Sequence, residues 1–227
     1  MSFSVTWIIF FSLLLVSFFA IVLTAKLLSK PIDEYKFSFM RIFPFEVIRS
    51  ADDNGRYYSL ATYLFSGICF SPIIMVVSEQ VALKTLNPLS ILIACVLGLA
   101  SICFVFLNIF DVTHTKPHLI LFAIFALLTL LGGILVTVRG FIAYDTFAKH
   151  GTNEYVFLVT AITSELLGVI PTLILILNPK LKTWAVLDKV NDEYVRPKKF
   201  TLAYSEWGLL LALFLIETIY FVQLLVK

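Results

Sequence analysis

Six long apolar stretches dominate the sequence and constrain what the chain can fold into. They cover about residues 3–25, 57–77, 88–110, 118–138, 155–177 and 204–226. Each is about 20 residues long or longer, the length that an α-helix needs to cross the ~30 Å hydrocarbon core of a bilayer. Because 60% of the 227 residues are hydrophobic and only 14% are charged, little sequence remains for a soluble domain. The sequence therefore predicts an all-α integral membrane protein, with residues 1–227 forming a single transmembrane domain of six helices.

Lysine and arginine are distributed unevenly between the connections. Segments 26–56 and 178–203 carry six each and Lys116 adds one, so thirteen fall on one side of the predicted membrane. The other side receives four, which are Lys84, Arg139, Lys149 and Lys227. Positively charged loops stay on the cytoplasmic side of a membrane. We therefore predict that loops 26–56 and 178–203 are cytoplasmic, that both termini are extracytoplasmic, and that the protein lies in the cell membrane.

Two glutamates interrupt apolar stretches at a depth where hydrocarbon is expected. Glu165 stands in TSELLGVIP and Glu217 in LFLIETIYF. Glu165 shares a narrow sector of the helical wheel with Glu154, Ala161, Gly168 and Thr172. Because these residues are small or polar, we expect Glu165 to face the interior of the bundle. Counting 1.5 Å per residue puts Glu165 about 15 Å and Glu217 about 14 Å from the same predicted boundary.

An acid in a membrane span is a hypothesis for a functional site, because ionising it at the helix centre costs about 2.5–3.5 kcal/mol. If the last two helices are neighbours, the two carboxylates would share a proton or bind a cation. Tyr220 lies one turn from Glu217 and would hydrogen-bond groups beside it. Glu165, Glu217 and Tyr220 are therefore candidate ion- or proton-binding residues. The alternative is that each acid is structural and fixes the register of its helix.

Small and polar residues recur at helical spacing and predict close helix packing. They are Gly98, Ser101 and Asn108 in 88–110, Gly133 and Thr137 in 118–138, and Gly168 in 155–177. Helices in a bilayer associate through small residues and hydrogen bonds, because lipid is as apolar as leucine. We expect these seams to carry no chemistry. Cys69, Cys95 and Cys103 also fall in apolar stretches and are expected to act as packing residues.

The turn DVTHTKPH contains residue types that bind metals. His114 and His118 are four residues apart, and Asp111 is nearby. Pro117 breaks the helix that would align the histidines, and no third strong ligand is evident. The sequence therefore predicts no metal site, with Asp111, His114 and His118 kept as weak candidates.

The two basic loops also contain aromatic residues, most densely in YKFSFMRIFPFEVIRSADDNGRYY. This composition is typical of segments at the lipid headgroup boundary, so we expect loops 26–56 and 178–203 to contact anionic headgroups. A docking surface for a partner protein is the alternative for the first loop. The sequence gives no indication of a nucleic-acid partner.

Three classes of function remain. A small transporter or channel-like protein would use Glu165 and Glu217 to bind protons or cations. A non-catalytic subunit or scaffold would pack its seams and acids against a partner membrane protein or a second copy. An intramembrane hydrolase is the least supported, because no nucleophile, base and metal fall in one layer. No P-loop, HExxH, GxSxG or EF-hand is present, so no catalytic residue is assigned, and any cofactor is unknown.

Overall fold

The computed structural model describes residues 3–28, 37–50, 54–84, 87–110, 115–148, 154–183, 188–190, 193–195 and 199–226. Six helices in these ranges are long and apolar enough to cross a membrane, as the sequence predicts. They are α1 (Phe3–Leu28), α3 (Asn54–Leu83), α4 (Pro88–Ile109), α5 (Thr115–Ala148), a helix interrupted in its middle and α8 (Thr201–Leu225). The interrupted helix consists of α6 (Glu154–Ser164), η2 (Glu165–Val169) and α7 (Ile170–Ile176).

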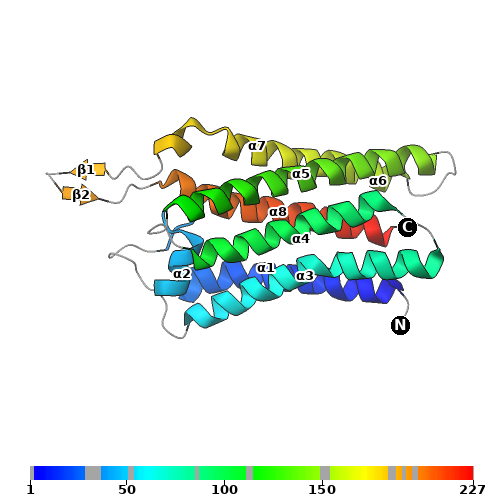
Figure 1. Ribbon diagram of the computed structural model, residues 1–227, viewed down its shortest axis with the longest axis horizontal. Coiled ribbons are helices and arrows are strands. Elements are labelled where there is room, and N and C mark those ends of the chain that lie inside the picture. Colours follow the sequence, from blue (N-terminus) through cyan, green and yellow to red (C-terminus); the bar gives the residue numbers. More distant parts are fainter. Residues whose placement is uncertain are drawn as a thin grey trace.

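The remaining elements are short and lie at one end of the bundle (Figure 1). They are α2 (Pro44–Ser50), η3 (Pro179–Thr183) and the antiparallel strands β1 (Asp188–Val190) and β2 (Glu193–Val195). We call this the hairpin end. The helix α1 begins and α8 ends at the opposite end, which we call the terminal end. An even number of crossings requires this arrangement, whereas the side of the membrane that each end faces stays a prediction.

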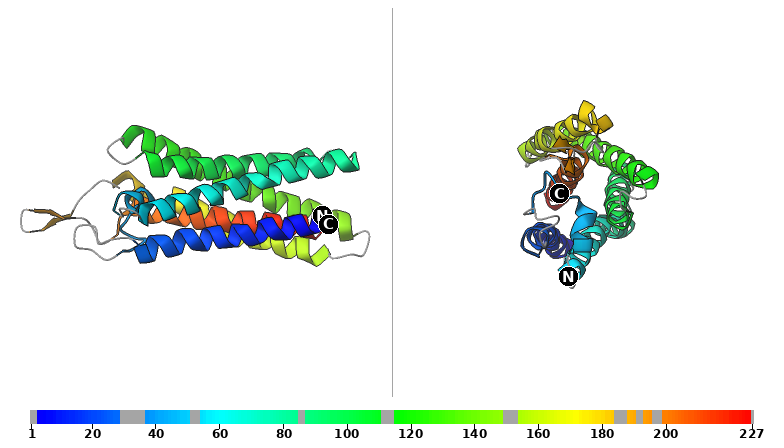
Figure 2. Two further views of the ribbon diagram at one scale, coloured as in Figure 1. Left: turned by 90° about the horizontal axis from the view of Figure 1, so that it is seen from below. Right: turned by 90° about the vertical axis from the view of Figure 1, so that its left-hand side faces the viewer.

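The last helix, α8, forms the centre of the packing. It contacts α1, α4, α5, α6, η2 and α7, while the other long helices contact mainly their neighbours in the chain. Figure 2 shows α8 enclosed by these helices when the bundle is viewed from the hairpin end. In its most apolar stretch, 67% of α8 is buried, compared with 28% of α1. Polar side chains on α8 are therefore removed from lipid as well as from water.

The helix α5 extends ten residues further towards the terminal end than the predicted stretch 118–138. Arg139 ends the apolar window, but arginine is a good helix former and does not end the helix. Gly140 then brings α5 against α6, because a Cβ at this position would lie 2.8 Å from the Cβ of Ala161. The prediction that Arg139 lies in a connection is therefore wrong. Without it, the basic residues on that side number three, against thirteen on the other.

The aromatic segment before α3 covers the hairpin end of the bundle. Phe43 and Phe45 are buried, and Phe43 N–H donates to the Glu46 carboxylate at the start of α2. Trp207 Nε1 donates to the Ile42 carbonyl oxygen at 2.8 Å. Phe43 and Phe45 thus belong to the core, so the prediction of lipid contact does not hold for them. For the basic residues of this segment it stays a prediction.

The interruption at η2 is a turn of π-helix, in which Ile170 N–H donates to the carbonyl oxygen of Glu165. Pro171 follows directly. Proline has no N–H, and its ring crowds the carbonyl four residues earlier, so a wider turn accommodates it. The interruption lies between α6 and α7, and both of these helices contact α8.

Candidate functional site

Glu165 and Glu217 occupy opposite environments. Glu217 is fully buried, whereas Glu165 is exposed on the outer surface of the bundle. The face of the interrupted helix that is buried carries Ala161, Ser164, Gly168 and Thr172. Glu165 lies beside this face rather than within it, at the first residue of the π-turn. The prediction that Glu165 points inwards is therefore wrong.

The structure also does not bring the two carboxylates together. At the level of η2, α8 presents Ile216 rather than Glu217. A Cβ at Gly168 would lie 2.6 Å from Cγ1 of Ile216, and one at Gly133 would lie 3.1 Å from its Cδ1. One residue further along α8, Glu217 faces α3, where the Cys69 thiol lies beside its carboxyl group.

The polar neighbour of the Glu217 carboxyl group is the Cys69 thiol, which is a weak hydrogen-bond donor. Both oxygens of the carboxyl group are buried, and neither forms a hydrogen bond of acceptable geometry within the described part of the chain. Glu217 lies eight residues before Leu225, which is about 12 Å from the terminal end of its span. Burying a polar group without a partner costs about 1–3 kcal/mol, and burying an isolated charge costs more.

A row of buried polar side chains connects Glu217 with the hairpin end. We call it the polar seam: Tyr58, Thr62, Ser66 and Cys69 of α3, Ser101 and Asn108 of α4, and Glu217. The α3 members are four, four and three residues apart, so they share one face. The Tyr58 hydroxyl donates to Asn108 Oδ1 at 3.4 Å, and the hydroxyl oxygens of Ser66 and Ser101 are 3.1 Å apart. Successive α3 members lie about one helical turn apart.

On the other side of Glu217, a buried cluster surrounds Arg139 at the terminal end. Arg139 Nε donates to Ser90 Oγ at 3.3 Å, and Nη1 donates to Gln223 Oε1 at 2.9 Å. Tyr220 donates to the Ser90 carbonyl oxygen at 2.7 Å, and the Arg139 guanidinium carbon lies 5.6 Å from the centre of its ring. Gln223 Nε2 also donates to Thr160 Oγ1. The cluster thus connects α4, α5, α6 and α8.

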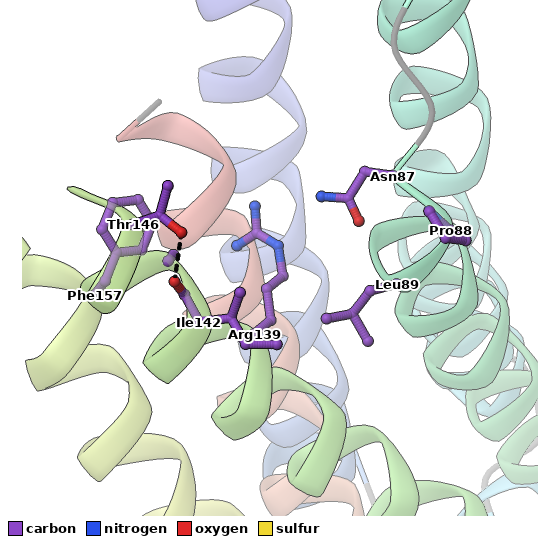
Figure 3. A pocket seen from close by; sticks show the side chains of 8 residues that line it. Asn87, Pro88, Leu89, Arg139, Ile142, Thr146 and Phe157 are labelled. Carbon is purple, nitrogen blue, oxygen red and sulfur yellow. Dashed lines mark hydrogen bonds between the residues drawn. The ribbon is translucent and has the colours of Figure 1, made fainter. Parts of the chain in front are cut away.

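The Arg139 side chain also borders a pocket of about 530 Å³. Figure 3 shows its guanidinium group between Asn87, which precedes α4, and Phe157 of α6. Sequence reasoning missed this cluster. A charge at the apparent end of an apolar stretch looks like a loop residue, and the apolar residues 141–143 that follow were the available signal.

A third polar site lies at the hairpin end, where His118 of α5 meets Glu206 of α8. The two side chains are 0% and 1% exposed, and Nε2 lies 2.7 Å from Oε1. The other ring nitrogen, Nδ1, lies 2.6 Å from the Phe110 carbonyl oxygen. A carbonyl oxygen only accepts, so Nδ1 carries a hydrogen. The contact between His118 and Glu206 therefore holds one proton, on either the imidazole or the carboxyl group.

This pairing bears on the weak metal candidates. Both nitrogens of His118 are engaged, whereas Asp111 and His114 lie outside the described residues. In the part of the chain that the structure describes, no group of three or more His, Cys, Asp or Glu side chains is arranged to hold a metal ion. No pattern in the sequence predicts that His118 pairs with a residue 88 positions away.

The small residues of the predicted seams lie between helices. Gly98 packs against the ring of Phe70, and a Cβ there would lie 3.2 Å from it. Ser101 and Asn108 belong to the polar seam, while Gly133 and Gly168 enclose Ile216. Thr137 is buried, and its hydroxyl has no hydrogen-bond partner within the described residues.

Comparison with known proteins does not supply a function. No protein-family model, curated protein or solved structure matches the chain. The site must therefore be interpreted from its own chemistry. Three buried titratable side chains differ in their hydrogen bonding within the described residues. Glu206 is paired with His118, Arg139 uses two of its donors, and Glu217 has only the weakly donating Cys69 thiol beside it.

Proposed function

We propose that the protein is a small transporter in which Glu217 binds and releases a proton or a small cation inside the bundle. The observation that carries this proposal is the fully buried carboxyl group of Glu217, which has the weakly donating Cys69 thiol as its polar neighbour and forms no hydrogen bond of acceptable geometry among the described residues. A carboxyl group that only fixed helix register would be expected to have a strong partner, as Glu206 has. An acid in a membrane span that lacks one favours a site that an ion or proton occupies in turn.

The surroundings of Glu217 support movement of such an ion. The polar seam leads from it towards the hairpin end, and Tyr220 and Arg139 lie towards the terminal end. The π-turn η2 packs against α8 beside Ile216, the neighbour of Glu217. Interrupted helices line the ion sites of many transporters, and π-turns are frequent at functional sites. Following the excess of basic residues, we place the hairpin end in the cytoplasm of a cell membrane protein, near anionic headgroups.

Reconstitution into proteoliposomes tests the proposal. The wild type should move protons or monovalent cations down an imposed gradient, recorded by a trapped pH dye or by isotope uptake. Glu217→Gln should abolish this flux, because the amide cannot ionise and brings no negative charge to hold a cation. Glu165→Gln is the matched control and should leave it unchanged, since Glu165 faces outwards. Flux no greater than in protein-free vesicles, or equal flux in Glu217→Gln, would refute the proposal.

A second function, as a subunit of a membrane complex, is favoured by Glu165. This carboxylate is exposed between the exposed side chains of Ile162 and Leu166. It lies ten residues from Tyr155, about 15 Å into the span, and is too short to reach water. A Lys or Arg on a partner helix would neutralise it there.

A photo-reactive residue at Leu166 tests this second function in native membranes. A partner helix predicts one discrete cross-linked protein, which Glu165→Gln weakens. Adducts with lipid alone would exclude this role for the surface around Glu165.

A further inference from the structure

The pocket beside Arg139 combines a buried positive charge with apolar walls. It lies at the terminal end, bordered by the start of α4, by α5 and by Phe157 of α6 (Figure 3). Leu89, Ile142 and Ala143 contribute apolar wall, and Asn87 lies at the rim. Its volume of about 530 Å³ is in the range of pockets that hold small organic molecules, about 300–1,000 Å³.

Arg139 is only partly used by the protein. A guanidinium group has five N–H donors. Two of them are bonded, to Ser90 Oγ and to Gln223 Oε1. The other three have no partner within the described residues, although Arg139 is only 7% exposed. Ser90 and Gln223 therefore hold the guanidinium group in place while it keeps donors for a further ligand.

No acid in the described residues forms an ion pair with Arg139. Glu79 of α3 is within electrostatic range of the guanidinium group and offsets part of its charge, but the two form no ion pair. A buried arginine without a paired carboxylate leaves a positive charge in a region of low dielectric. Such a charge attracts an anion that brings two acceptor oxygens, because carboxylates and phosphates match the geometry of the guanidinium fork.

The start of α4 adds to the positive potential. This helix has 22 residues, begins at Pro88 and directs its N-terminus to the same pocket. The N-terminus of a helix carries a partial positive charge and attracts anions. The side chain of Asn87 accepts from Ser90 N–H, whereas Leu89 N–H at the pocket belongs to the first turn of the helix, whose N–H groups have no acceptor within the helix. Arg139 and the N-terminus of α4 thus both attract a negatively charged group to the pocket.

We infer that this pocket binds an amphiphilic organic anion, with its carboxylate or phosphate head on Arg139 and its apolar body along Leu89, Ile142 and Phe157. The anion comes either from the bilayer, as an acidic lipid, or from the aqueous phase, as a soluble amphiphile. The binding itself does not depend on transport through Glu217. It adds an anionic ligand to a protein whose other candidate site takes a proton or a cation.

Saturable binding of radiolabelled octyl phosphate to the full-length protein in phosphatidylcholine nanodiscs tests the inference, with protein-free nanodiscs as background. Arg139→Gln should weaken binding about tenfold or more, since it removes charge-assisted hydrogen bonds. Ala143→Phe should block the pocket without touching Arg139 and serves if Arg139→Gln does not fold. Arg56→Gln, which removes a positive charge at the hairpin end, is the matched control and should bind normally.

Competition experiments distinguish the contribution of the ligand's charged head from that of its apolar body, and they identify the phase from which the ligand comes. Octanoate should displace octyl phosphate, whereas octanol and inorganic phosphate should displace it much less. Phosphatidic acid in the nanodisc should displace it if the ligand is a bilayer lipid and should not if the ligand is a soluble amphiphile; either result supports the anion site. Absence of saturable binding, or equal binding by Ala143→Phe and wild type, would overturn the inference. Inorganic phosphate competing as well as octyl phosphate would overturn its amphiphilic part.

Discussion

Replacing Glu206 tests the conclusion that its contact with His118 holds a single proton. In Glu206→Gln, the side-chain amide can still donate to Nε2 of a neutral imidazole whose Nδ1 hydrogen is bonded to Phe110. In Glu206→Leu, Nε2 has no partner and is surrounded by apolar groups that include Phe45, whose ring centre is 5.7 Å away. The two substitutions should therefore differ, although both remove the same carboxylate.

The size of the difference follows from the burial of the pair. Glu206→Gln exchanges a charge-assisted hydrogen bond for a neutral one, which costs about 1 kcal/mol. Glu206→Leu leaves Nε2 of His118 without a hydrogen-bond partner. Because both side chains of the pair are buried, water cannot replace the lost partner, and the cost is about 2–3 kcal/mol. For a chain of this size, 1 kcal/mol corresponds to about 2–4 °C in Tm. We expect a decrease of at most about 4 °C for Glu206→Gln and about 4–12 °C for Glu206→Leu.

Thermal unfolding in a maltoside detergent, followed by tryptophan fluorescence at one fixed scan rate, measures both values. The fixed rate matters because the unfolding of membrane proteins is often irreversible. Glu165→Leu is the matched control: it removes an exposed carboxylate and should not lower Tm. Equal decreases in Tm for Glu206→Gln and Glu206→Leu would refute the single-proton contact.

Three further predictions concern other parts of the molecule. Gly168→Ala should lower the free energy of unfolding by about 1–3 kcal/mol, because its Cβ would lie 2.6 Å from Cγ1 of Ile216. A double-mutant cycle with Ile216→Ala, measured by unfolding in detergent, tests this contact. Additive losses of stability in the cycle would contradict it. Tyr220→Phe should lose about 1 kcal/mol, since it removes the 2.7 Å hydrogen bond to Ser90, and an unchanged Tm would show that this bond is not stabilising. With the native cysteines replaced, Lys84→Cys should react with an impermeant thiol reagent added outside intact cells, and Lys180→Cys should not. The reverse pattern would invert the proposed topology.

The sequence predicted the helices well because apolar length is a local property. Each of the six apolar stretches corresponds to a helix, of which the fifth is interrupted at η2, directly before Pro171. The ends of the helices were less predictable. A hydropathy window stops at a charge, whereas a helix stops where its backbone groups or packing require it, so α5 continued through Arg139.

The candidate site was predictable only in part, because the direction of a side chain depends on which helices are neighbours. Glu217 was identified as an intramembrane acid, and it is buried. Glu165 had the same kind of sequence context, but its helix rests on α8 through Gly168 and so turns Glu165 outwards. The partners His118 and Glu206 are 88 residues apart, and no pattern within either segment specifies their contact.

The two buried acids of α8, Glu206 and Glu217, differ in their hydrogen bonding, and this difference helps to distinguish a structural acid from a functional one. If buried charge served only to fix helix positions, Glu217 would be expected to have a strong partner as Glu206 has, rather than the weakly donating Cys69 thiol, since both acids lie on α8, the most buried of the long helices. Between them lie apolar residues of α8 such as Leu210 and Leu213, so the two acids do not satisfy each other. Tyr220, one turn from Glu217, instead bonds to Ser90, which also holds Arg139. Tyr220 thus ties α8 to the Arg139 cluster and not to Glu217, so within the described residues the guanidinium group and the Glu217 carboxyl group belong to separate polar networks.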